Sequence, residues 1–219
     1  IPKPTRKLKT TYTREPTQDG ERRVTLRRTG DVQALSVMYR TAAGSHPDYA
    51  ALVVLANLLT DEPSGRLYKA MVETKKASGV GGTSSGFAEG GMAYFVAELR
   101  LEQSMAEAET AMLNTLDDLK TTVPTAEEVE NAKTRILKNF EMMFKQSDRV
   151  GLGISNYIGW GDWRLGFLYR DNVEKVTPED VARVAQRYFK PANRTVGVFI
   201  PDNAPDRADV PGVPNVAEL

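Results

Sequence analysis

The amino-acid sequence predicts an α+β domain in which helices pack on one side of a mostly antiparallel sheet. Three observations indicate this fold class. Alternating apolar residues, which are typical of half-buried strands, occur in the first half of the chain and again near its end. Apolar residues at three- and four-residue spacing, which are typical of amphipathic helices, fill the region between them. The strands therefore come in adjacent groups rather than one after each helix, and this order favours antiparallel pairing.

Composition and charge narrow the possible functions. The chain has 219 residues, of which 41% are hydrophobic and 26% charged, as in ordinary globular domains. Its 29 Lys and Arg residues balance 29 Asp and Glu residues, so no basic footprint favours nucleic-acid binding. The absence of cysteine excludes disulfides, thiolate zinc ligands and thiol catalysis. The longest apolar run, within residues 50–59, is about half of the ~20 residues that a membrane span needs, so it predicts a core helix.

The N-terminal region predicts an arm followed by two strands. Residues 1–20 mix Pro, Thr and Lys without periodicity, and we interpret them as a linker or arm. Residues 21–28 and 32–43 have the pattern of strands, and the Thr29-Gly30-Asp31 sequence between them favours a hairpin. We expect a single domain over residues 21–201 and a C-terminal linker over residues 202–219.

The next segment predicts two helices and a second hairpin. Ser45-His46-Pro47-Asp48 has the composition of a helix cap and precedes an apolar helix over residues 49–59. After the helix-breaking sequence DEPSG, a shorter helix is expected over residues 66–76. Residues 79–92 are rich in Gly and Ser, and alternating apolar residues follow from Ala93 to Leu101. This pattern predicts a strand that forms a hairpin with the stretch before it.

Capping motifs mark where the remaining helices begin. They are Ser104 with Glu107, Thr125 with Glu128, and Thr177 with Pro178 and Asp180. The apolar period that begins after the second motif continues almost to Trp160, which predicts one long helix that bends at Gly151 and Gly153. The third motif predicts a helix from Pro178 to Lys190, and the alternation over residues 195–200 predicts a closing strand.

Few residues can carry chemistry. His46 is the single histidine, and no His, Cys or Glu stands at metal-ligand spacing beside it, so we interpret it as part of a helix cap. This inventory excludes zinc sites based on His and Cys and also Ser-His-Asp triads. The densest acidic pairs, Asp61-Glu62 and Asp117-Asp118, could form a carboxylate site, but their positions favour solvated helix ends or faces.

Two further stretches each have a structural and a functional interpretation. The run Gly79–Gly86 lacks the Gly-Lys-Ser/Thr of a phosphate loop, and Ser84 stands where a dinucleotide motif needs its third glycine. The run favours a flexible or bulged edge strand, which could also accept an extended peptide. An aromatic group near the C-terminal third could be a binding platform, although packing in a core or domain interface is the more common role. Its members are Tyr157, Trp160, Trp163, Phe167 and Tyr169.

Two stretches resemble the second, non-catalytic domain of the insulinase/pitrilysin-type (inverzincin) zinc metallopeptidases. They are GSHPDYAALVVLANLLTDEPSGRLYKAMVE at residues 44–73 and the closing region from GDW at residue 161 to VGVFIP at residue 201. The resemblance covers nearly the whole chain and is greatest to large bacterial members in which two similar halves are fused. It implies an inactive peptidase domain of the mitochondrial-processing-peptidase/insulinase type, with a sheet of five or six strands backed by helices.

The resemblance also implies where the chemistry lies. Family members hold zinc on an inverted H-x-x-E-H helix, plus a distal Glu, in a separate domain. Here His46 is followed by Pro47-Asp48-Tyr49-Ala50, so that motif is absent, and Ala93 stands where the last domain of the family usually supplies an Arg. We therefore expect no catalytic and no metal-binding residue in this chain, and the substrate-binding residues are left unassigned. The resemblance implies zinc in the catalytic domain of the full-length protein.

Two functions remain open. The first is a non-catalytic domain of a zinc endopeptidase that packs on the zinc-bearing domain, meets the second half of the same protease, and helps to wall a chamber for peptide substrates. The second is a stand-alone pseudopeptidase or core subunit with an assembly role. An H-x-x-E-H motif in the about 200 residues preceding Ile1 would favour the first. The bacterial relatives also imply a periplasmic location, for which any export signal would lie outside this chain.

Overall fold

The computed structural model describes residues 16–210 and residue 212. In chain order the elements are β1 (Arg22–Arg28), β2 (Gln33–Thr41), α1 (Asp48–Thr60), a π-helical turn (Tyr68–Glu73), β3 (Gly79–Gly86), β4 (Gly91–Leu99), α2 (Met105–Asp118), α3 (Ala126–Phe144), α4 (Ser147–Gly159), α5 (Leu165–Lys175), α6 (Pro178–Tyr188), a 3-10 turn (Pro191–Asn193) and β5 (Arg194–Pro201). The α+β fold class predicted from the sequence is confirmed.

The strands form one five-stranded sheet in the order β1-β5-β2-β4-β3. The pairs β2–β5, β2–β4 and β3–β4 are antiparallel, whereas β1 runs parallel to β5. The predicted β3–β4 hairpin is confirmed, but the predicted hairpin between the first two strands is wrong. The last strand lies between β1 and β2, because its alternating Val196 and Val198 fill the core beside the inward residues of β2.

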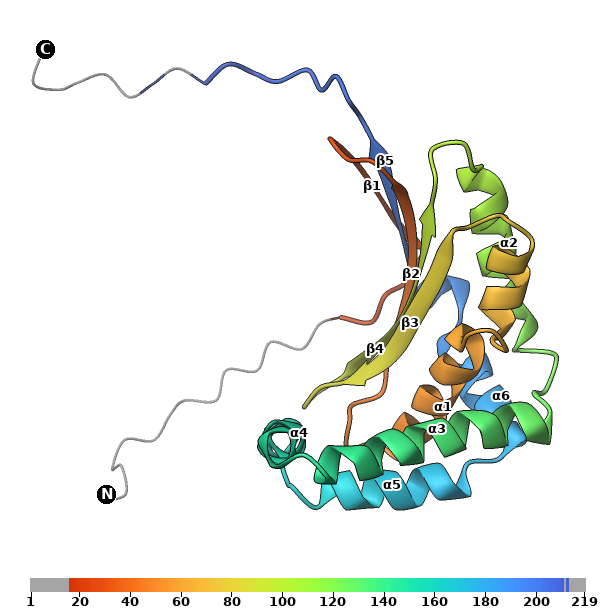
Figure 1. The fold of residues 1–219 in the computed structure, drawn as a ribbon, viewed down its shortest axis with the longest axis vertical. Helices are drawn as coiled ribbons and strands as arrows, with labels where there is room; N and C mark the ends of the chain where they lie inside the picture. Colours follow the sequence, from red (N-terminus) through yellow and green to blue (C-terminus); the bar gives the residue numbers. More distant parts are fainter. Residues whose placement is uncertain (1–15, 211, 213–219) are drawn as a thin grey trace, which may run out of the picture.

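Helices cover one face of this sheet, as Figure 1 shows for α1, α2, α3, α5 and α6. The inward side chains of the two central strands, such as Leu35, Val37 and Phe95, are fully buried against them. Helix α1 is the centre of this layer, because it contacts β3 and β4 on one side and α3, α5 and α6 on the other. Full burial of an aliphatic or aromatic side chain stabilises the fold by about 1.5–3 kcal/mol, so this layer dominates the stability.

Local capping chemistry places most helix starts where the sequence predicts them. The capping boxes at Thr125 and Thr177 are both present, and the Ser104 side chain accepts a hydrogen bond from the Glu107 backbone N–H. The cap predicted at residues 45–48 is wrong. Pro47 occupies the N-cap position with helical backbone angles (φ −55°, ψ −33°) and no side-chain cap. The imidazole Nδ1 of His46 instead accepts the Asp48 N–H at 3.0 Å.

The long helix predicted from Thr125 to Trp160 is two helices. Helix α3 ends at Phe144, and α4 begins at Ser147 after Gln146 adopts an extended backbone (φ −123°, ψ 105°). The break precedes Gly151 and Gly153, which were expected to bend the helix. Residues 145–149 are all polar, so no apolar side chain in this stretch anchors a continuous helix on the core.

The segment before β1 is only partly described, since residues 1–15 of the predicted arm lie outside the described residues. Within the part that is described, Gln18 is 7% exposed and donates hydrogen bonds to the backbone oxygens of Arg194 at 2.7 Å and Gly20 at 2.8 Å. The bond to Arg194 holds the segment that precedes β1 against the first residue of β5. Of the helices described, none combines the length and hydropathy required to cross a bilayer.

Candidate functional site

The single histidine lies next to a buried carboxylate at the start of α1. Asp48 is 4% exposed and accepts hydrogen bonds from Arg183 Nη1 at 2.7 Å, Arg187 Nη1 at 3.0 Å and the Tyr188 hydroxyl at 2.8 Å. Burial opposes ionisation of Asp48, but the hydrogen bonds from Arg183 and Tyr188 outweigh it and lower the pKa of the carboxyl. Asp48 therefore joins α1 to α6. Because both of its carboxylate oxygens accept hydrogen bonds, it is not placed to act as a base.

The two acidic pairs singled out in the sequence lie in separate ion-pair networks. Asp61 pairs with Arg135 of α3 and accepts a hydrogen bond from Ser64 at 2.6 Å. Asp117 pairs with Lys120 at 2.6 Å, and Asp118 lies 3.9 Å from Arg66. Asp61, Asp117 and Asp118 therefore each face a cation, which is the arrangement of structural ion pairs and not of two cooperating catalytic carboxyls.

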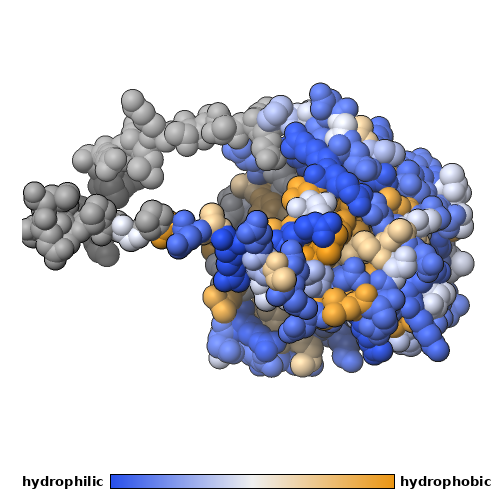
Figure 2. All heavy atoms as spheres, turned by 90° about the horizontal axis from the view of Figure 1, so that it is seen from above, coloured by the Kyte–Doolittle hydropathy of each residue, from blue (hydrophilic) through white to orange (hydrophobic). Residues whose placement is uncertain are grey.

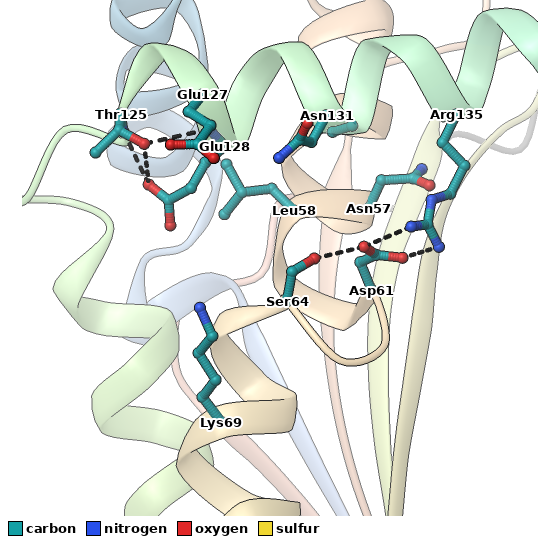
Figure 3. Close-up of a pocket in the computed structure, with 11 residues that line it drawn as sticks. Asn57, Leu58, Asp61, Ser64, Lys69, Thr125, Glu127, Glu128, Asn131 and Arg135 are labelled. Carbon is teal, nitrogen blue, oxygen red and sulfur yellow. Dashed lines mark hydrogen bonds and ion pairs between the residues drawn. The ribbon is translucent and has the colours of Figure 1, made fainter.

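A polar cavity lies between the end of α1 and the start of α3 (Figure 3). It has a volume of about 240 Å³ and is lined by Asn57, Leu58, Asp61, Ser64, Lys69, Thr125, Glu127, Glu128, Asn131, Ala132 and Arg135. Beside it, Arg66 Nε donates to Glu128 Oε1 at 2.7 Å, and this hydrogen bond is the main reason that the pKa of Glu128 falls to about 2. Of the charged groups that line the cavity, Asp61 is paired with Arg135 and Glu128 is paired with Arg66.

The zinc implied by the family resemblance does not fit the side chains of this domain. Within residues 16–210 and 212, no three His, Cys, Asp or Glu residues are grouped so that they could hold a metal ion. The imidazole Nδ1 of His46 already accepts a backbone N–H, and its nearest carboxylate, Asp48, is held by two arginines. Zinc needs three or four ligands aimed at one point, and this donor set does not supply them.

The run Gly79–Gly86 forms β3, an edge strand of the sheet, as the sequence predicts. The N–H of Phe87 donates to the oxygen of Gly90 at 2.7 Å, which fixes the alternation of hydrogen bonds along the hairpin. Residues 79, 81, 83 and 85 therefore bond to β4, while the backbone groups of residues 80, 82 and 84 point to the free edge. This edge can accept a further extended strand through main-chain hydrogen bonds.

The second face of the sheet, which we call the open face, has no helix of the described residues on it (Figure 1). Strand register gives the row of side chains that crosses its centre, and this row contains few large groups. It runs through Val24, Gly197, Ser36, Val96 and Gly81. Two glycines and a serine in a row of five leave a flat surface over which an extended chain could lie.

Apolar side chains flank this central row. On one side the register places Leu26, Phe199 and Ala34 in line, and on the other it places Met38 and Tyr94. Leu26 is 52% exposed and Val24 is 58% exposed, so the β1 end of the open face shows apolar groups to solvent. Figure 2 shows that hydrophobic residues reach the surface in separate patches among hydrophilic ones.

The aromatic group predicted from the sequence divides into two clusters. In the first, Trp160 meets Tyr49 edge-on with 5.2 Å between ring centroids and Tyr157 with 5.0 Å between them, and Tyr169 completes the group. Burial raises the pKa of Tyr157 to about 12 and also raises that of Tyr169. These hydroxyls therefore stay protonated at neutral pH, and the cluster is a packing element between α1, α4 and α5.

The second cluster lies where α3 ends and α5 begins. The rings of Phe140, Phe144, Trp163 and Phe167 contact one another, with centroid distances between 5.1 and 6.2 Å. The Arg170 guanidinium lies 5.6 Å from the Phe167 ring centre. Trp163 is 52% exposed and Phe144 is 39% exposed, so this cluster faces solvent in the described structure.

Sequence reasoning missed Tyr49, Phe140 and Phe144 as members of these clusters. Phe144 stands four residues after Phe140, a spacing that puts both rings on one face of a helix, so this signal was available. Tyr49 gave no such signal, because its partner Trp160 is more than a hundred positions away. Gly44 is part of the same corner, since a Cβ there would lie 2.5 Å from the Trp160 ring.

Comparison with known families and structures gives two kinds of match. The profile of the family described as Peptidase M16 inactive domain matches residues 1–136. The crystal structure of the inactive peptidase domain of a protein from Bordetella parapertussis, assigned as a zinc protease, has 38% sequence identity and a TM-score of 0.75. That match covers 84% of this chain and 99% of the other. No curated protein matches this chain.

Longer proteins contain the same fold as one part of their length. A protease from Helicobacter pylori matches with a TM-score of 0.83 and 23% identity, over 90% of this chain but 48% of its own. The periplasmic protease PqqL from Escherichia coli matches with a TM-score of 0.60 and 17% identity, over 84% of this chain and 21% of its own. The chain thus spans about half of the first protein and about a fifth of the second.

Proposed function

This chain belongs to the family of peptidase M16 inactive domains, and from this premise we propose that it is the non-catalytic domain of a zinc metalloendopeptidase. Membership of the family confirms the resemblance found in the sequence. In the proposed arrangement a separate domain carries the zinc, and this domain packs on it. The open face of the sheet forms part of the wall of a chamber in which peptides are cleaved.

The observation that carries this proposal is the contrast between a protease-type fold and a donor set unable to bind zinc. The fold is that of a domain from a protein assigned as a zinc protease at 38% identity. The only imidazole of the chain accepts a backbone hydrogen bond beside a carboxylate held by two arginines. Hydrolysis by a metal-activated water therefore requires ligands from elsewhere in the protein.

The geometry of the open face supports the wall role. Its central row of Val24, Gly197, Ser36, Val96 and Gly81 is flat, and the apolar groups beside it can contact the side chains of an extended peptide. The free edge of β3 adjoins the same face, so main-chain hydrogen bonding to a peptide is possible at its margin. Periplasmic location is part of the proposal, supported by the shared fold of a periplasmic protease.

The test compares the 219-residue chain with the full-length protein that carries it. We expect the full-length protein to bind zinc and to cleave peptides in a reaction that a chelator stops, and the chain alone to do neither. Zinc analysis after dialysis and hydrolysis of a fluorogenic peptide measure the two properties. Chelator-sensitive hydrolysis by the chain alone would refute the proposal, and a full-length protein without zinc or hydrolysis would favour the pseudopeptidase role.

Two substitutions on the open face test the wall role itself. Gly81→Lys and Val96→Lys place a charged side chain on the central row, and a Cβ at Gly81 meets no atom within 4 Å. We expect each to raise KM or lower kcat for peptide hydrolysis severalfold in the full-length protein without changing its zinc content. Val123→Lys is the matched control, because Val123 is 50% exposed in the connection between α2 and α3. Equal kinetics in all three variants would contradict the wall role.

A further inference from the structure

Helix α4 has no buried residue among its 13, although it is flanked by helices that pack on the core. Its inner side touches the body at Gly153, where a Cβ would collide with Met143. Its outer side carries Leu152, which is 73% exposed, and Ile158, which is 59% exposed. Figure 1 shows α4 at the ends of α3 and α5, near the end of the β3–β4 hairpin.

Helix α4 also lacks the local features that stabilise a short helix. Its N-cap residue, Gln146, makes no side-chain cap, and the helix contains Gly151 and Gly153. Each glycine costs a helix interior about 1 kcal/mol relative to alanine. Isolated helices of fewer than about 12–15 residues are marginal in water even with favourable sequences. The inner side of α4 is only half-buried, through residues such as Ile154 and Tyr157, so a partner on its outer side would stabilise this helix further.

The side chains around α4 have the composition of an interface. The aromatic cluster of Phe140, Phe144, Trp163 and Phe167, with Arg170 against one ring, lies where α4 joins its two neighbouring helices. A shallow hollow of about 580 Å³ is lined by the three phenylalanines and Arg170 of this cluster, together with Glu141, Lys145 and Glu174. Aromatic residues, Met and Arg are enriched in the buried centres of protein interfaces, where they contribute most of the binding energy.

We propose that the outer side of α4 and this aromatic cluster are the docking surface for the zinc-bearing domain. We call it the α4 surface and define it by four exposed residues: Leu152 and Ile158 of α4, Phe144 at the end of α3, and Trp163 in the connection to α5. The proposal rests on the proposed function, since it names the place where the catalytic domain sits. It commits to that domain as the occupant and not to a second copy of this chain.

Two observations favour this occupant. The Helicobacter pylori protease contains this fold in 48% of its length, so a second part of similar size accompanies the domain there. In addition, α4 and the hairpin end enclose one cavity of about 420 Å³, lined by Phe87 of the hairpin connection, Met143 of α3 and Tyr157 of α4. Since the hairpin is also the margin of the open face, a domain seated on α4 would border the space in front of that face.

Amide hydrogen exchange tests the proposal on the protein as it exists. Exchange of residues 148–159 is measured by mass spectrometry in the 219-residue chain and in the full-length protein. We expect exchange in α4 to be at least about tenfold slower in the full-length protein, because a covered helix opens less often than a solvated one. Equal exchange rates in the two proteins would overturn the proposal. Slow exchange in the chain alone that depends on its concentration would identify a second copy as the occupant and would also overturn it.

A double variant tests whether the aliphatic side chains of Leu152 and Ile158 make the contact with the zinc-bearing domain. Leu152→Gln with Ile158→Gln should restore fast exchange of α4 in the full-length protein, while the chain alone keeps its stability because both side chains are already exposed. Leu101→Gln with Val123→Gln is the control, since these residues are 57% and 50% exposed in connections distant in sequence from α4. Unchanged protection in the α4 variant would overturn the proposal.

Zinc content and peptide hydrolysis, measured on the same full-length samples, separate this inference from the proposed function. An active, zinc-containing protein whose α4 exchanges as fast as in the chain alone would overturn the docking surface and leave the function standing. A full-length protein with neither zinc nor hydrolysis would overturn the function, and with it the identity of the occupant.

Discussion

The end of the β3–β4 hairpin packs closely on the loop before α1, at two glycines. A Cβ at Gly86 would collide with the Gly44 Cα and would lie 2.8 Å from the Gly44 nitrogen. Gly44 in turn lies against the Trp160 ring and donates its N–H to the Phe87 oxygen at 3.0 Å. Backbone atoms cannot move aside as the end of a flexible side chain can, so this corner requires glycine.

Gly86→Ala should destabilise the domain by about 2 kcal/mol, because the added methyl group meets backbone and forces the hairpin end away from its neighbours. Gly81→Ala is the matched control in the same strand, where a Cβ meets nothing within 4 Å. We expect its effect to stay within about 0.5 kcal/mol. Urea unfolding of both variants measures the difference, and equal destabilisation by the two would contradict this account of the corner.

At the scale of elements, reciprocal caps decide where helices begin. Glu128 is held by two kinds of contact. It accepts the Thr125 backbone N–H at 2.8 Å, and it pairs at 2.7 Å with Arg66, which lies just before the π-helical turn. The side-chain hydrogen bond from Arg66 is the largest cause of its lowered pKa, followed by opposing burial and then by the bond from Thr125. One carboxylate thus starts α3 and attaches it to the rest of the fold.

The pH dependence of this contact has a definite sign. The pKa of Glu128 falls from an ordinary 4.5 to about 2 on folding, so its contribution is complete above pH 4.5 and is lost as the pH falls towards about 2. Glu128→Gln keeps the capping geometry but removes the charge, and should cost about 1 kcal/mol at pH 7. Urea unfolding at several pH values should show the two proteins converging near pH 2. A difference that stays constant over this range would contradict the assignment.

Element boundaries are predicted best where they depend on residues that are close together in the sequence. The caps at Ser104, Thr125 and Thr177 act over three residues, so they could be identified without the fold. The end of α3 at Phe144 and the separate helix α4 were not predicted, because Met143 and Val150 on either side of the polar residues 145–149 are seven positions apart and keep the helical period. The pairing of β1 with β5 depends on residues at opposite ends of the chain, and no local pattern specifies it.

On the scale of the whole molecule, a single buried carboxylate connects segments that are far apart in the sequence. Asp48 opens α1, and its partners Arg183 and Arg187 lie 135 and 139 positions later in α6. The same bonds fix the C-terminal helix against the central helix of the layer. This role of Asp48 was not predicted, because its sequence context indicated only a helix cap. The absence of a zinc motif, in contrast, could be read directly from the residue inventory.

Asp48→Asn should destabilise the domain by about 2 kcal/mol, since Arg187 loses its carboxylate partner and Arg183 keeps only Asp180. The cost stays below that of a fully buried pair because both arginines reach solvent. Asp162→Asn removes an exposed pair with Arg164 and serves as the control, for which we expect no measurable change. Thermal unfolding followed by circular dichroism compares the variants. Equal melting temperatures for wild type and Asp48→Asn would contradict the connecting role of this carboxylate.

The position of β5 between β1 and β2 has a consequence for how the chain folds during synthesis. Strands β2, β4 and β3 can associate as soon as they leave the ribosome, but β1 has no hydrogen-bonded neighbour until residues 194–201 follow. Until then the nascent chain presents an unpaired edge of β2 and a solitary β1, both of which are exposed to association with other chains. The final strand is therefore the step that closes the sheet, and truncations that remove it would leave the domain incomplete however much of the helical layer has formed.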